Sequence, residues 1–157
     1  MALQLPAATA VAAVPDRLRP PEGQQLVLQA SASGVQIYEC RTDAAGVSTW
    51  AFKEPAAQLR QNIIHYRGPN WQSTQDGSRV MGRVVASVPN INPAKNIPDL
   101  LLEAVGNSGD GVLGSIDFVQ RLRSMGGVGP TGSCNPSADD EVAVQYTSAY
   151  RFWSDAR

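Results

Sequence analysis

The side chains best suited to chemistry in this sequence lie in one short segment, residues 63–79. The single histidine of the chain is followed there by aromatic, cationic and acidic side chains, with Gly-Pro and Asp-Gly pairs between them. The candidate site residues of this segment are His65, Tyr66, Arg67, Trp71, Asp76 and Ser78. This density of functional groups is unusual for a connecting loop and makes the segment our candidate site.

His65 and Asp76 form the candidate catalytic pair. If the two turns fold the segment into a hairpin, the carboxylate can lie opposite the imidazole, fix its tautomer and raise its basicity for general acid–base work. Both residues also have an ordinary structural interpretation, because Asp-Gly is a preferred turn pair and a buried histidine often only satisfies backbone groups. Ser78 could complete a Ser-His-Asp set, but the sequence does not place the three side chains together.

The other candidates are ligand-binding residues. Beside the catalytic pair we expect the ligand contacts to be Tyr66, Arg67, Trp71 and Ser78. Arg121 and Arg123 share one face of an expected strand and could hold an anionic ligand, although two solvated arginines are the more common outcome.

No cofactor and no metal ion is predicted. A lone histidine lacks companion ligands, and the carboxylates are scattered over distant loops. Gly109, Gly111 and Gly114 have the spacing of a dinucleotide fingerprint, but the strand before and the helix after that such a site needs are missing. We interpret these glycines as a β-turn.

Cys40 and Cys134 are too few for a zinc site and lack the spacing of a redox motif. They form either a disulfide or two buried thiols, and we favour the disulfide. Such a bridge would stabilise the fold by about 4 to 5 kcal/mol in the chain-entropy model. A disulfide is also typical of exported proteins.

Residues 1–22 are expected to be a flexible tail, and residues 23–157 a single β domain. The segment Met1–Val14 is alanine-rich and uncharged, and the first basic residue is Arg17, so a basic signal region is lacking. The tail belongs either to a mature exported protein whose signal was replaced by a start Met or to a cytosolic protein. We favour the first, and predict a secreted or periplasmic protein.

Composition and charge exclude several classes of protein. The 157 residues suffice for one domain of ordinary size. Basic residues number 13 and acidic residues 14, without blocks of like charge, which argues against a nucleic-acid partner. No apolar run is long enough for a membrane span.

Short β-branched and aromatic runs separated by glycine and proline predict an all-β fold. Leu26–Ala30 and Val35–Cys40 should pair across a tight turn at Ser33-Gly34, and Glu54–Arg60 should form a helical turn. The further expected strands are Ser48–Phe52, Arg79–Val88, Leu100–Val105, Val112–Ser124 and Val142–Trp153. About eight short strands predict a single-domain antiparallel β-sandwich or small β-barrel with long Gly/Pro-rich loops.

Several spaced motifs together resemble one known family. They include Gly34-Val35-Gln36-Ile37-Tyr38-x-Cys40, His65-Tyr66-x-Gly68-Pro69-x-Trp71, Asp76-Gly77-Ser78-x-Val80 and Tyr146-x-x-x-Tyr150-x-Phe152. From about Leu26 to Trp153 the chain resembles the family catalogued as domain of unknown function 3455. The resemblance implies a small exported, predominantly β protein of bacteria or fungi, with its two cysteines paired and no established activity.

These observations predict an exported β protein that binds a small, largely apolar or aromatic ligand in a pocket near His65. One alternative is a cofactor-free lyase, isomerase or hydrolase, with His65 as general base and Asp76 orienting it. Another is a structural or surface-interaction module, in which the same segment is packed and closed.

Overall fold

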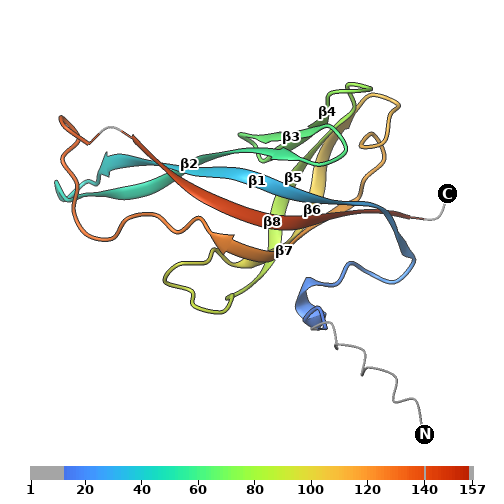
Figure 1. Ribbon diagram of the computed structural model, residues 1–157, viewed down its shortest axis with the longest axis horizontal. Coiled ribbons are helices and arrows are strands. Elements are labelled where there is room, and N and C mark those ends of the chain that lie inside the picture. The colour runs from blue at the N-terminus through green and yellow to red at the C-terminus, as the bar shows by residue number, and fades with distance from the viewer. Residues whose placement is uncertain (1–12, 140, 156–157) are drawn as a thin grey trace, which may run out of the picture.

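The protein is an antiparallel barrel of eight strands in the computed structural model, which describes residues 13–139 and 141–155. Each strand pairs with the next along the chain, and β8 closes the ring on β1 (Figure 1). The strands are β1 (Gln24–Thr42), β2 (Ser48–Leu59), β3 (Ile63–Tyr66), β4 (Asn70–Ser73), β5 (Arg79–Val88), β6 (Asp99–Ser108), β7 (Phe118–Gly126) and β8 (Glu141–Asp155). The all-β prediction is confirmed, and of its two architectures the barrel is the one formed.

The turn expected at Ser33-Gly34 is wrong, because β1 runs through it as one long strand. Gly34 lies in register with Ala57 of β2 and Tyr146 of β8. A Cβ atom at position 34 would lie 2.3 Å from the carbonyl oxygen of Ala56. The glycine therefore permits a close approach of two strands and does not reverse the chain.

The helical turn expected at Glu54–Arg60 is also wrong, because β2 continues to Leu59. The register with β1 shifts so that Ile37 pairs with Glu54 while Tyr38 pairs with Phe52, which leaves Lys53 as the extra residue of a β-bulge. The bulge explains why two consecutive side chains, Phe52 and Lys53, both line the interior cavity described below.

The inner face of the barrel carries the main core. Side chains of β8 alternate as expected, with Tyr146, Ser148, Tyr150 and Phe152 all buried on one face. Among the described residues, Trp71 of β4 is the largest fully buried side chain. The expected strand Arg79–Val88 coincides with β5, whereas residues 112–117 form a loop before β7.

The chain ahead of β1 packs on the outside of the barrel. The short 3-10 helix η1 (Asp16–Leu18) places Leu18, fully buried, against Leu101 and Leu122. The Gln120 amide donates a hydrogen bond to the carbonyl of Leu18 at 2.6 Å. This part of the expected tail is therefore fixed to the domain, while residues 1–12 lie outside the described residues.

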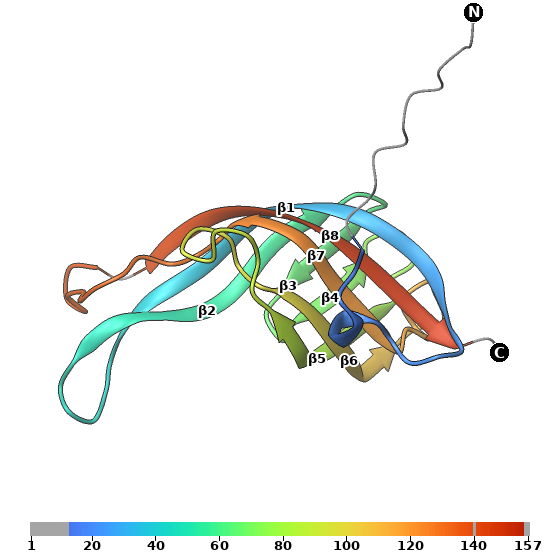
Figure 2. The ribbon, with the colours of Figure 1, turned by 90° about the horizontal axis from the view of Figure 1, so that it is seen from below.

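Strands β1 and β2 extend beyond the barrel wall as an arm, which Figure 2 shows projecting from the closed part of the sheet. The loop between β7 and β8 lies along this arm and forms an isolated bridge between Ser133 and Thr49. Cys134 of the loop is bonded to Cys40 of β1, which confirms the predicted disulfide. The disulfide therefore joins the arm to the loop between β7 and β8.

Candidate functional site

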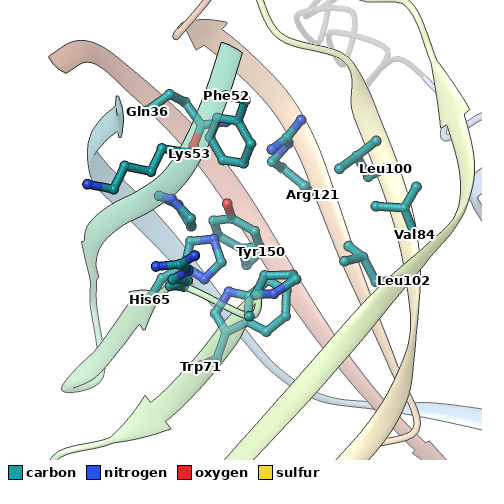
Figure 3. Close-up of a pocket in the computed structure, with 14 residues that line it drawn as sticks. Gln36, Phe52, Lys53, His65, Trp71, Val84, Leu100, Leu102, Arg121 and Tyr150 are labelled. Atoms are coloured by element: carbon teal, nitrogen blue, oxygen red, sulfur yellow. The ribbon is translucent and has the colours of Figure 1, made fainter. Parts of the chain in front are cut away.

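A cavity of about 520 Å³ opens into the barrel interior, and every strand contributes to its wall. Figure 3 shows Gln36, Lys53 and His65 on one side of the cavity, with Val84, Leu100 and Leu102 on the other. The remaining lining residues are Phe52, Pro55, Arg67, Gly68, Pro69, Trp71, Arg121 and Tyr150. The wall is therefore mainly apolar and aromatic, with a few polar groups.

His65 lies on β3 in register with Trp71 of β4, and only 4% of it is exposed. The two rings stack with their centroids 4.4 Å apart and an interplanar angle of 12°, and the Tyr150 ring lies 5.3 Å from the imidazole. The imidazole Nδ1 is 2.9 Å from the backbone carbonyl oxygen of Asn70. Because a carbonyl only accepts, Nδ1 carries the proton of the neutral ring and Nε2 is left as an acceptor.

Burial lowers the pKa of His65 to about 4. The positive charge of Arg121 acts in the same direction, and the hydrogen bond to Asn70 opposes both without overcoming them. The imidazole is therefore neutral at physiological pH. It can accept a hydrogen bond inside the cavity but is a weaker base than a solvated histidine.

Asp76 lies in the turn between β4 and β5. Its hydrogen bonds, with those of Ser78, link this turn to the loop at Val112 and Leu113, and we call this set of hydrogen bonds the clasp. One carboxylate oxygen accepts hydrogen bonds from the backbone N–H and the hydroxyl of Ser78, and the other accepts from the N–H of Val112 at 3.0 Å. The Ser78 hydroxyl accepts from the N–H of Leu113 at 2.9 Å. The expected His65–Asp76 pair is replaced by two separate sets of contacts, because each residue uses a backbone partner of its own.

The other predicted site residues divide between the cavity and its surroundings. Trp71 and Arg67 line the cavity, Trp71 deep inside and Arg67 exposed in the turn after β3. Tyr66 instead donates a hydrogen bond to the side chain of Gln72, and Ser78 is fully buried in the clasp with Asp76. Of the predicted segment, the structure therefore brings together His65, Arg67 and Trp71.

Arg121 lines the cavity, although the sequence pattern groups it with Arg123 on one face of a strand and not with the candidate site. Its guanidinium turns inward and is 9% exposed, whereas Arg123 on the same strand is exposed. The two side chains separate because the register of β7 with β8 shifts between Leu122 and Met125, with Arg123 at a positive φ of 53°. In the sequence, the only sign of an anion-binding role for Arg121 was its spacing from Arg123.

The clasp gives a pH-dependent prediction for stability. Its hydrogen bonds, chiefly those from Ser78, lower the pKa of Asp76 to about 2 from its ordinary value of 3.8. Because the folded pKa is the lower one, the stabilisation is present above pH 3.8 and is lost as the pH falls through about 2.

Asp76→Asn should therefore be less stable than the wild type at pH 7, and the difference should shrink toward pH 2. Urea unfolding across this range measures it, with Asp110→Asn, an exposed carboxylate of the neighbouring loop, as control. A difference between wild type and Asp76→Asn that does not change with pH would contradict the clasp.

The fold and the site define a class of protein: a small disulfide-bonded antiparallel barrel with an internal cavity. The chain belongs to the family described as "Protein of unknown function (DUF3455)", whose model matches residues 20–65 and 60–154. The resemblance drawn from the spaced motifs is thereby confirmed. No curated protein and no solved structure matches the chain. Among the described residues, no helix is long and apolar enough to cross a membrane.

Proposed function

We propose that this protein binds a small, largely apolar or aromatic molecule inside the barrel. The observation that carries the proposal is the cavity of about 520 Å³ inside the closed barrel. Small barrels either fill their interior with side chains or hold one small ligand, and ligand pockets generally have volumes of this order. Leu100, Leu102 and the face of Trp71 supply apolar surface for such a molecule.

Two residues that line the cavity each have an unpaired buried polar atom. The side-chain oxygen of Gln36 and the indole Nε1 of Trp71 are buried without a hydrogen-bond partner. An unpaired buried polar atom is destabilising, and native proteins contain few of them. Both atoms are covered in the barrel, so a bound molecule would satisfy them only by shifting these two side chains.

A screen of small apolar and aromatic compounds by thermal unfolding tests the proposal. A ligand at about 100 times its Kd should stabilise the fold by about 2.7 kcal/mol and raise the Tm by several degrees. Leu100→Trp should reduce this shift by occupying part of the cavity, whereas Val105→Trp, at an exposed position of the same strand, should retain it. A library that leaves the Tm unchanged would favour the structural or surface-interaction module.

A cofactor-free enzyme is the second candidate function, and one feature favours it. His65 lines the cavity with Nδ1 held by Asn70, so its Nε2 has a fixed tautomer for accepting a proton. The predicted partner Asp76 has no part in this arrangement. If the ligand is a substrate, His65→Gln should stop its turnover while leaving its binding measurable; turnover that survives this substitution would contradict His65 as the base.

We also propose that the protein is exported, to the bacterial periplasm or out of the cell. The support is the disulfide between Cys40 and Cys134, because such bonds persist in oxidising compartments and are rare in the cytosol. Fractionation of cells expressing the natural gene, followed by thiol labelling, would test it. Recovery in the cytosol with both thiols reduced would overturn the proposal.

A further inference from the structure

Arg121 is a buried cation that contributes to the cavity wall. Its Nε and Nη2 donate hydrogen bonds to the backbone carbonyl of Pro98 at 3.1 and 2.8 Å. The side chain of Tyr150 is a further hydrogen-bond partner of Arg121. A guanidinium has five N–H donors, so these contacts still leave donors free to bind another group. The interaction with Pro98 orients the guanidinium without neutralising its charge.

Within residues 13–139 and 141–155, no carboxylate forms an ion pair with Arg121. The four ion pairs of this part of the chain all involve other cations: Arg19, Arg41, Lys53 and Arg83. A charge buried away from water is destabilising unless it is paired, and buried arginines are generally paired for this reason. The wall of the cavity thus has an unbalanced positive charge.

The other charged residues of the cavity wall have the same sign. Lys53 and Arg67 line the cavity beside Arg121, and the lining includes no aspartate or glutamate. Lys53 is paired with Glu141, so the charge not balanced locally belongs to Arg67 at the rim and Arg121 inside. A concave apolar site lined by one sign of charge concentrates ligands of the opposite sign.

We infer that the ligand is an organic anion, with an aromatic or apolar body inside the barrel and a carboxylate that pairs with Arg121. This inference rests on the proposed binding function and narrows it to acids. A planar carboxylate matches the fork of a guanidinium and can accept two parallel N–H bonds from it. Leu100 and Leu102 lie on the neighbouring wall of the same cavity, where they can contact the apolar body (Figure 3).

Matched acid and alcohol probes separate the charge from the apolar contact. Cinnamate is compared with cinnamyl alcohol, and decanoate with decanol, by NMR titration of the wild-type protein at neutral pH. We expect at least one acid to bind about tenfold more tightly than its alcohol, because the charged hydrogen bonds to Arg121 are available only to the acid. The preference should weaken as salt is added.

Variants then assign the preference to one side chain. Arg121→Gln should bring the acid to within about threefold of the alcohol, because it removes the charged pair that only the acid can form. Arg123→Gln, an exposed arginine on the same strand, should retain the full preference. The wild-type comparison remains decisive if Arg121→Gln does not fold.

The outcomes separate this inference from the function on which it rests. Equal binding of acid and alcohol by the wild type would overturn the inference and leave the binding function standing. Binding of none of the four probes would overturn both. An acid preference that persists in folded Arg121→Gln would overturn the assignment to Arg121.

Discussion

Replacing both cysteines by serine is expected to lower the free energy of unfolding by about 4 to 5 kcal/mol. Cys40 and Cys134 are separated by 94 residues, so their bond closes most of the domain into one loop. In the chain-entropy model, a loop of this length removes much of the freedom of the unfolded chain. The expected loss is a large part of the stability of a typical domain of this size.

Urea unfolding of the wild type and of the double variant Cys40→Ser, Cys134→Ser measures the difference. Wild type treated with a reductant is the matched control and should lose about the same amount. A loss below about 1 kcal/mol would contradict the expectation.

The bridge lies on the arm formed by β1 and β2, whereas the cavity lies within the closed part of the sheet. A folded double variant should therefore bind the same ligands as the wild type. Stability and binding then respond to different residues, which distinguishes structural from functional positions in this barrel.

The strand pattern was predicted best where side chains alternate strictly. The alternation in β8 placed Tyr146, Tyr150 and Phe152 on one face, as the structure has them. The turn at Gly34 was wrong because a glycine can serve either a chain reversal or a close approach of strands. A single sequence does not distinguish these two uses, since the second depends on a partner strand, here at Ala56.

The site was predicted only in part, because its geometry depends on strand register. The short connection after β3 places Trp71 opposite His65, and Asp76 falls beyond the end of β4. Arg121 faces inward in register with Tyr150, whereas a backbone irregularity after Leu122 turns Arg123 outward, and this irregularity has no signature in composition or periodicity. The sequence therefore identifies the segment that contains several cavity residues, but it does not show which of their side chains contact one another.

Acidification from pH 7 to pH 4 is expected to remove about 3 kcal/mol of stability through His65 alone. The folded pKa of about 4 lies below the ordinary value of 6.5, so the unfolded chain takes up a proton before the folded protein does. Stability from the neutral buried ring is therefore complete above about pH 6.5 and falls as the pH approaches 4.

His65→Gln isolates this contribution, because the amide can still donate to the Asn70 carbonyl but does not titrate. The stability difference between wild type and variant, measured by urea unfolding at several pH values, should shrink by about 3 kcal/mol from pH 7 to 4. Carboxylates such as Asp76 titrate in both proteins, so their effects cancel in the difference. Parallel stability profiles would show that the ring is protonated in the folded barrel as readily as in the unfolded chain, which would contradict the lowered pKa of His65.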